Sequence, residues 1–261
     1  MPTYTATGIT LIARKYGDTG RVVSFCTRER GKVEAVARGV GKPASRLAAA
    51  VEPFTMSKLF FAEGRDLDRL TQAEVIEAHL PLRHDMRLYA YGAYLLELTN
   101  VTTEVGQAHP ELFDDLAASL AALMAGDDAE IITWGFTLRL LVSQGSAPEV
   151  DVCVECGGEL KGRASYAPGQ GGFICQRCSP TSEGRLQVSG AALGALRSLA
   201  TMPIARLNRV ALKAQARREV SRVIRAHTDY HVGDNLKSRA FLEKMARDGH
   251  RVEEGNDHDQ C

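Results

Sequence analysis

The stretch that decides the N-terminal fold is RVVSFCTRERGKVEAVAR, residues 21–38. Its first half contains two valines and a phenylalanine, and its second half alternates apolar and polar side chains. Alternation with a period of two is typical of a β-strand that buries one face. Gly31 separates the halves, so residues 21–28 and 32–38 are predicted to form two strands joined by a tight turn.

Three further segments of the first eighty residues are rich in Ile, Leu, Val, Phe or Thr: residues 6–13, 54–61 and 67–76. Glycines separate most of these segments. Five short strands at this spacing predict a small Greek-key barrel. Such a barrel often has an extra helix between its third and fourth strands, and we expect residues 47–51 to form it.

After the fifth strand the hydrophobic period becomes that of a helix. Apolar residues recur at helical spacing from Leu88 to Leu98, and a second helix is predicted between Pro110 and Gly126. The segment Ile131–Val142 is apolar on nearly all sides, which is typical of a central helix in a bundle.

The last third of the chain is also predicted to be helical. Ser189 is the expected N-cap of one helix, a long helix is expected over residues 204–231, and a last helix over residues 237–247. The polar tail over residues 248–261 is expected to be disordered.

The composition is that of an ordinary folded chain, with 261 residues, 44% hydrophobic and 25% charged. No run of about 18 apolar residues is present, so no membrane span is expected. The N-terminus lacks the pattern of a secretory signal, so a cytoplasmic location is expected.

The formal net charge is zero, but the charges are unevenly distributed. Residues 1–50 carry a net charge of +6, residues 81–152 of −8, and residues 153–245 of +8. Basic regions of this size indicate a polyanion as partner. Three solvated faces of differing sign are the alternative, and charge alone does not decide between the two interpretations.

Four of the six cysteines form two Cys-x-x-Cys pairs separated by eighteen residues: Cys153, Cys156, Cys175 and Cys178. Each pair can turn two thiolates toward one ion, and four thiolates complete a tetrahedral shell with no open position for water. We therefore expect one structural zinc ion, Zn(2+), per chain. Redox-active pairs are the alternative, but the short glycine-rich spacer favours zinc.

The candidate phosphate contacts of the predicted barrel are its cations, several of which fall at strand ends or turns. Barrels of this kind bind their ligands there and use aromatic rings as stacking platforms, for which Tyr16 and Phe25 are candidates. The cations are Arg14, Lys15, Arg21, Arg28, Arg30, Lys32, Arg38, Lys42 and Arg46.

A second cationic group falls on the predicted long helix and the helix after it. Its members are Arg206, Arg209, Lys213, Arg217, Arg218, Arg222 and Lys237. The first four are spaced 3, 4 and 4 and so share one helix face. They form either a site for phosphates or an acidic peptide, or the solvated face of a bundle helix.

No motif for chemistry on a substrate is present, so the protein is expected not to be an enzyme. The sequence has neither a phosphate-binding Gly-Lys-Ser/Thr loop nor a Gly-x-Ser-x-Gly turn. His227 and His231 have the spacing of metal ligands but lack a third ligand, so we expect a helix-surface pair. The acids Asp114–Asp115 and Asp127–Asp128 are expected to serve helix starts and turns.

Four stretches resemble, in order, the RecO family of bacterial recombination mediators. They are YGDTGRVV with TRERGKVEAVARG in residues 8–39, residues 45–54, YLLEL at 94–98 with FTLRLL at 136–141, and YHVGDNLKSRAFL at 230–242. The resemblance implies an α+β multidomain chain. A five-stranded OB-fold barrel is implied for residues 1–80, and a helical domain for residues 81–150 and 181–247, with a four-cysteine zinc ribbon inserted at 151–180.

The resemblance also implies a function in DNA repair and recombination. Proteins like this bind single- and double-stranded DNA, anneal complementary strands and bind the acidic tail of single-stranded DNA-binding protein (SSB). With RecR, in the RecFOR pathway, they help to load RecA on SSB-coated strands, at the nucleoid. Two alternatives stay open: a zinc-ribbon regulatory protein that reads duplex DNA, and a thiol oxidoreductase.

Overall fold

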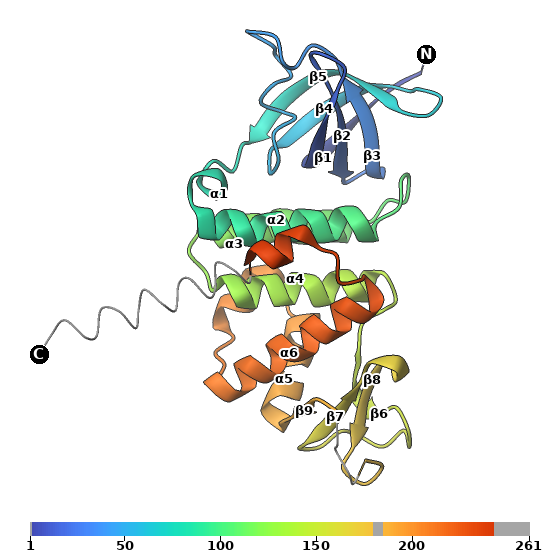
Figure 1. The fold of residues 1–261 in the computed structure, drawn as a ribbon, viewed down its shortest axis with the longest axis vertical. Helices are drawn as coiled ribbons and strands as arrows, with labels where there is room; N and C mark the ends of the chain where they lie inside the picture. The colour runs from blue at the N-terminus through green and yellow to red at the C-terminus, as the bar shows by residue number, and fades with distance from the viewer. Residues whose placement is uncertain (1, 180–184, 243–261) are drawn as a thin grey trace, which may run out of the picture. The chain divides into compact units, whose positions relative to one another are not determined.

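The computed structural model describes residues 2–179 and 185–242 (Figure 1). Its contacts divide the chain into two compact units. The first, called the barrel unit below, comprises Met1–Ala125 and Asn235–Cys261, and the second, the ribbon unit, comprises Gly126–Asp234. Among the residues described, no helix is both long enough and apolar enough to cross a membrane.

Five strands of the barrel unit form a closed barrel in the order β1-β2-β3-β5-β4. They are β1 (Thr3–Tyr16), β2 (Gly20–Thr27), β3 (Gly31–Ala37), β4 (Met56–Ala62) and β5 (Asp68–Glu77). Antiparallel ladders join β1 to both β2 and β4, and a short parallel pairing of β3 with β5 closes the ring. The five-stranded barrel predicted from the sequence is confirmed.

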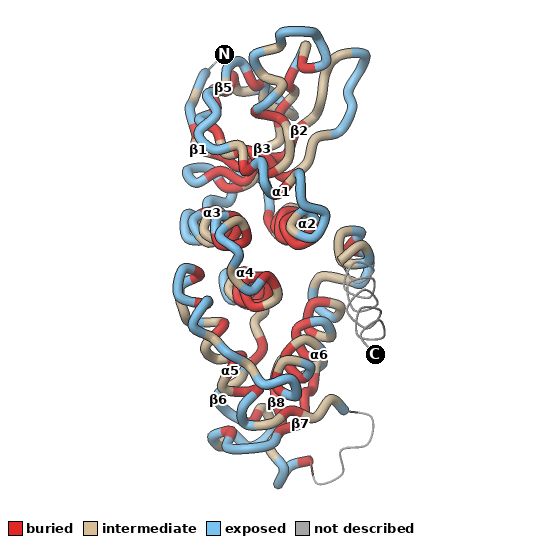
Figure 2. Tube along the Cα trace, turned by 90° about the vertical axis from the view of Figure 1, so that its left-hand side faces the viewer, coloured by how far each residue is buried: buried red, intermediate tan, exposed pale blue. Residues whose placement is uncertain are grey.

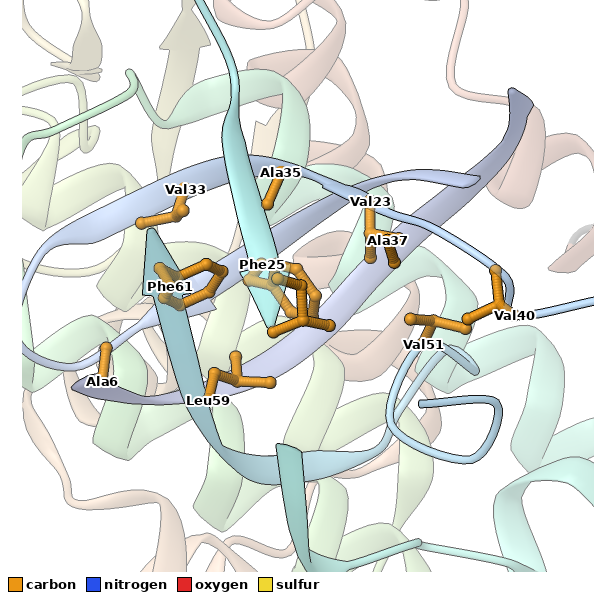
Figure 3. Close-up of a cluster of buried hydrophobic side chains, with 11 residues drawn as sticks. Ala6, Val23, Phe25, Val33, Ala35, Ala37, Val40, Val51, Leu59 and Phe61 are labelled. Atoms are coloured by element: carbon orange, nitrogen blue, oxygen red, sulfur yellow. The ribbon is translucent and has the colours of Figure 1, made fainter. Parts of the chain in front are cut away.

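Alternate side chains of the strands fill the interior of the barrel (Figure 3). Phe25 and Phe61 are fully buried, and their rings meet edge to face with centroids 5.8 Å apart. Val40 and Val51, from the connection between β3 and β4, pack against the same core. Phe25 is therefore a core residue and does not serve as a stacking platform.

The prediction of a short helix at residues 47–51 is wrong, because this segment consists of turns. One helical hydrogen bond is present, from the Val51 N–H to the Leu47 carbonyl, but two of the carbonyls that follow accept from side chains. The Ala50 carbonyl accepts a hydrogen bond from the Thr10 hydroxyl, and the Ala49 carbonyl accepts one from the Thr55 hydroxyl. The bond from Thr10 holds the connection against β1, and the bond from Thr55 closes a turn within the connection.

Three helices of the barrel unit follow the barrel: α1 (Pro81–His84), α2 (Met86–Thr102) and α3 (Pro110–Met124). The helix predicted to begin at Pro110 is confirmed. The barrel packs on α2 at Gly92, where a Cβ would lie 2.8 Å from the Phe54 ring. Gly31, at φ +68°, passes the backbone of Gln107 too closely for any side chain, so the β2–β3 turn lies directly on the α2–α3 loop.

The chain returns to the barrel unit near its C-terminus, where residues 237–242 are helical. Glu97 of α2 accepts hydrogen bonds from the backbone N–H groups of Lys237 and Ser238, and Leu236 is buried. The rest of the predicted last helix and the tail predicted to be disordered lie outside the described residues.

The ribbon unit combines helices with a small sheet. Its helices are α4 (Ala129–Ser143), α5 (Gly190–Thr201), α6 (Ala214–His231) and the 3-10 segments η1 (Pro168–Gln170) and η2 (Ile204–Arg209). Its sheet has the order β6-β8-β7-β9, with β6 (Glu149–Cys153), β7 (Ala164–Ala167), β8 (Gly172–Cys175) and β9 (Gln187–Val188). Ser189 caps α5 as predicted, since its side chain accepts from the Ala192 N–H.

The central helix predicted at Ile131–Val142 is confirmed as α4. Most of its residues are buried (Figure 2), and within the ribbon unit it packs against α5, η2 and α6. One contact is very close: Leu207 of η2 lies against Gly135, where a Cβ would collide with the leucine side chain.

The prediction of one long helix over residues 204–231 is wrong, because this segment forms two separate elements. The chain forms η2, is extended on either side of residues 211–212, and begins α6 only at Ala214. Packing explains the break, since Leu207 is fully buried and η2 follows the surface of α4. As a result, Arg206, Arg209 and Lys213 do not share a helix face with Arg217.

Candidate metal centre and nucleic-acid interface

The four cysteines of the predicted zinc ribbon lie together in the ribbon unit. Cys153 ends β6 and Cys175 ends β8, and Cys156 and Cys178 lie in the turns that follow. Their four Sγ atoms all lie within 4.8 Å of one another. The predicted ligands therefore form one cluster that could hold a metal ion.

Tight turns place these thiols. In the first turn the Gly157 N–H donates to the Cys153 carbonyl, and Gly157 has φ +68°, a region that favours glycine. In the second turn the Ser179 N–H donates to the Cys175 carbonyl. Each Cys-x-x-Cys pair thus turns its two side chains toward the other pair.

The backbone also prepares the cluster electrostatically. Burial raises the pKa of the Cys153 thiol, but the N–H groups of Cys175, Cys156 and Glu155 outweigh burial and lower that pKa to about 6. Hydrogen bonding with Cys156 and Cys175 raises the pKa of Cys178 to about 12. Four thiolates this close together need a cation to balance their charge, and soft sulfur donors favour zinc-like metals.

Two cations of the β2–β3 turn are bound to the helices of the barrel unit. The Arg28 guanidinium donates two hydrogen bonds to the Asp114 carboxylate of α3, at 2.9 and 3.0 Å. The Lys32 ammonium donates to the Asn100 carbonyl of α2 at 2.9 Å. These predicted DNA contacts therefore hold the barrel to its own helices.

Two further barrel cations are paired with acids on the barrel. Arg21 lies 3.2 Å from Glu52, and Arg30 lies 3.2 Å from Glu63. The Arg30 guanidinium also lies over the Tyr4 ring, 3.8 Å from its centroid. Both cations are half-exposed, so they remain within reach of an anion.

The other five predicted barrel cations have no ion-pair or hydrogen-bond partner in the described part of the chain. We call them the open cations: Arg14, Lys15, Arg38, Lys42 and Arg46. All five are exposed. The structure thus separates the nine predicted residues into a bound set and an open set.

Three of the open cations lie near the β1–β2 turn of the barrel: Lys15, Arg38 and Lys42. Arg38 follows Ala37, which pairs with Arg21 in the β2–β3 ladder, and Lys42 follows Gly41. Lys15 pairs with Arg21 in the β1–β2 ladder, and the Gly41 N–H donates to the Thr19 carbonyl. The connection after β3 therefore lies against the β1–β2 turn. A hollow of about 400 Å³ lies there, and its charged lining residues are Lys15, Arg21 and one acid, Asp18. Tyr16, at the end of β1, is 52% exposed and remains a stacking candidate.

Arg65 and Arg69 were missed by sequence reasoning. Both are exposed. Arg65 lies in the connection between β4 and β5, and Arg69 is the second residue of β5, where it pairs with Val36 across the β3–β5 ladder. Arg69 is thus a near neighbour of Arg38. Arg69 could have been identified from the sequence, because it lies at the start of the predicted fifth strand, and strand ends are where the other candidate cations were sought.

Arg217 is the most heavily bound cation of the second group. Its guanidinium donates two hydrogen bonds to Asp128, at 2.7 and 2.8 Å, and one to Glu130 at 2.5 Å. Asp128 is also the N-cap of α4, where it accepts from the Glu130 and Ile131 N–H groups, as expected for an acid at a helix start. The guanidinium lies 5.5 Å from the Trp134 ring centroid.

The remaining members of the second group are exposed, but they do not form one stripe. They are Arg206, Arg209, Lys213, Arg218, Arg222 and Lys237. The first two lie on η2, Lys213 is the N-cap of α6, and Lys237 belongs to the barrel unit. Only Arg218 and Arg222 share a face of α6, one turn apart.

The expectation of a helix-surface histidine pair is wrong for His227, which is buried. Its ring nitrogens lie 2.6 Å from the Tyr166 hydroxyl and 2.6 Å from the Ser146 carbonyl. Burial lowers its pKa to about 4, so the ring is neutral at pH 7. His227 therefore connects α6 to the ribbon, and His231 alone is on the surface.

Comparisons with known proteins agree with this architecture. Two family models match, "Recombination protein O N terminal" over residues 1–79 and "Recombination protein O C terminal" over residues 83–240. The DNA repair protein RecO of Bacillus pumilus (strain SAFR-032) is 37% identical over 91% of this chain and 93% of its own length. The DNA repair protein RecO of Pelotomaculum thermopropionicum is 32% identical over 95% of this chain and 96% of its own length. The DNA repair protein RecO of Bacillus subtilis (strain 168) is 34% identical over 91% of this chain and 93% of its own length.

Proposed function

This chain belongs to the recombination protein O family, whose role lies in DNA repair and recombination, and we propose that it binds single- and double-stranded DNA and anneals complementary strands. The observation that carries the proposal is the set of five open cations, of which Lys15, Arg38 and Lys42 lie near the β1–β2 turn. Five exposed charges with no partner among the described residues are available to phosphates.

Counterion release gives the proposal a quantitative form. If each open cation neutralises one phosphate of a single strand, the logarithm of affinity falls with the logarithm of salt with a slope of about −3.5. Tyr16 supports the same contact, because an exposed ring beside cations can stack on an unpaired base.

Annealing follows from the same charges. Two complementary strands repel each other through their phosphates, and a basic surface that holds both strands lowers this repulsion. No nucleotide hydrolysis is needed for such a step. We propose accordingly that the protein acts by binding and is not an enzyme.

The proposed protein partners are SSB, through its acidic C-terminal tail, and RecR, with which the chain would help to load RecA. A tail that is acidic and ends in apolar residues needs an apolar wall beside a cation. A hollow of about 400 Å³ in the ribbon unit has this character, with Pro168 and Leu186 beside Arg185. Arg222 lies one helical turn before Ala226, which also lines the hollow.

We propose that the four cysteines hold a structural zinc ion. A zinc ion bound to four thiolates supplies a fixed cross-link and no open coordination position. Structural zinc contributes on the order of 10 kcal/mol to the folding of small modules. Here it would add to a small core in which Tyr166 and Phe173 are fully buried.

The decisive experiment is the annealing of two complementary oligonucleotides coated with SSB, with no nucleotide present. Tail-dependent acceleration, absent with SSB that lacks its acidic tail, is the expected result. Binding without acceleration would contradict the mediator function. A preference for one duplex over scrambled duplexes would favour the regulatory alternative instead.

A further inference from the structure

The barrel is not fully paired along β5. Its ladder with β3 covers only Asp68–Leu70, and β4 occupies the other side of the strand. From Thr71 to Glu77, the side of β5 that faces away from β4 has no strand partner within residues 2–179 and 185–242. By contrast, the β3 edge is closed near Lys32, which bridges to Val105.

This free edge is accessible. Six of the seven residues in 71–77 are exposed, Ala73 being the exception. Val75 is 45% exposed and Ile76 54%, and Leu80, just beyond the strand, is 50% exposed. Folded proteins usually protect such an edge with charged side chains, above all lysine, or with proline, a β-bulge or a covering segment. The segment TQAEVIE has two glutamates and irregular register at Thr71 and Ile76, but it contains neither lysine nor proline, and Gln72–Val75 pair regularly with β4.

We propose that residues 71–77 of β5 are a docking edge, at which an extended segment of a partner protein adds a strand to the barrel. Strand addition takes its affinity from main-chain hydrogen bonds and its specificity from alternate side chains. Exposed Val75 and Ile76 offer apolar contacts at the end of the strand, where the register of the β4–β5 ladder shifts.

Charge defines the partner segment further. Glu74 and Glu77 are the only charged residues of the free edge. Lys58, which pairs with Glu74 in the β4–β5 ladder, has its ammonium over the Phe60 ring, 5.6 Å from the centroid. The carboxylate thus remains open to a cation, and the partner segment is expected to alternate basic and apolar residues.

The same charges count against two other occupants. If a second copy paired antiparallel with the edge about its centre, Glu74 would face Glu74, and like charges directly opposite destabilise a ladder. DNA is disfavoured because the edge is acidic. The proposal concerns a different surface from the open cations, so it stands or fails independently of DNA binding.

The test uses the full chain and a nine-residue peptide of alternating lysine and valine, with blocked ends. Hydrogen exchange of the amides in residues 71–77 is expected to slow when the peptide binds. A glutamate–valine peptide is expected to bind at least tenfold more weakly, and a lysine–valine peptide N-methylated at every residue, which has no N–H donor on either edge, not at all. Equal binding of the N-methylated peptide, or no slowing at 71–77, would overturn the proposal.

Variants keep the test independent of folding. Val75→Lys with Ile76→Lys is expected to reduce lysine–valine binding at least tenfold, whereas Val101→Lys, at an equally exposed position of α2, is not. Glu74→Lys with Glu77→Lys should reverse the preference toward the glutamate–valine peptide. Unchanged preference would overturn the charge argument. Concentration-dependent protection of 71–77 without peptide would assign the edge to a second copy, and protection by DNA would assign it to nucleic acid.

Discussion

The Arg217 guanidinium donates hydrogen bonds to the carboxylates of Asp128 and Glu130 and lies near the Trp134 ring. Arg217→Gln is expected to lower the free energy of unfolding by about 1–2 kcal/mol, a figure reduced for the partial exposure of the pair. Arg218→Gln, on the next and exposed residue, is expected to change it by less than about 0.5 kcal/mol. Urea unfolding followed by the fluorescence of Trp134, the single tryptophan, measures both. Equal effects of the two substitutions would contradict the network.

The same pair predicts a pH dependence. The hydrogen bonds from Arg217 are the main cause that holds the Asp128 pKa below its ordinary value of 3.8. A carboxyl with a depressed folded-state pKa contributes stability above its unfolded pKa and loses it as the pH falls through the folded value. The difference in stability between the wild type and Arg217→Gln should therefore shrink below about pH 4. A constant difference under acid conditions would argue against the ion pair as its source.

The cysteine cluster gives the next prediction at this scale. Cys153→Ser removes the one ligand that is fully buried, and is expected to abolish zinc binding and to lower the melting temperature. Cys26→Ala is the matched control, because Cys26 is a buried thiol outside the cluster. Metal analysis of the purified variants should give about one zinc per chain for the control and none for Cys153→Ser. Retained zinc in Cys153→Ser would rule out a four-thiolate site.

Among the elements, the β2–β3 turn carries the clearest test of how the barrel is held. Gly31→Ala would place a methyl group on the Gln107 backbone at a positive φ, and should destabilise the protein by about 2–3 kcal/mol. Gly17 has a similar φ but open space around it, so Gly17→Ala isolates the strain, about 1 kcal/mol. Equal losses of stability in denaturant unfolding would mean that the turn does not press on the loop.

The two sets of barrel cations should differ in function. Lys15→Glu, Arg38→Glu and Lys42→Glu together are expected to weaken DNA binding and to flatten its salt dependence, with an unchanged melting temperature. Arg28→Glu with Lys32→Glu should instead lower the melting temperature, because these cations bind the helices. Fluorescence anisotropy at several salt concentrations measures the first effect. Wild-type affinity of the triple variant would remove the β1–β2 turn from the interface.

Across the whole molecule, the sequence predicts what depends on local pattern. Strand alternation and cysteine spacing are local, and the barrel and the cysteine cluster were both predictable. The partners of the cations were not, because Arg28 meets Asp114 across 86 positions. The break before α6 and the burial of His227 also depend on contacts with distant segments. A basic residue in a sequence thus does not reveal whether its charge is free.

The barrel's dependence on its helices yields the last prediction. The Phe54 ring packs against Gly92 of α2, Gly31 contacts the α2–α3 loop, and the Lys32 ammonium binds the Asn100 carbonyl of α2. Segments that follow the barrel in the chain therefore cover part of its surface. A chain of residues 1–80 would expose Phe54 to water, and burial of one such ring is worth about 2–3 kcal/mol. We expect this fragment to unfold at a clearly lower temperature than residues 1–125, as circular dichroism would measure. Equal melting temperatures would show that the barrel is an independent folding unit and that its contacts with α2 add no stability.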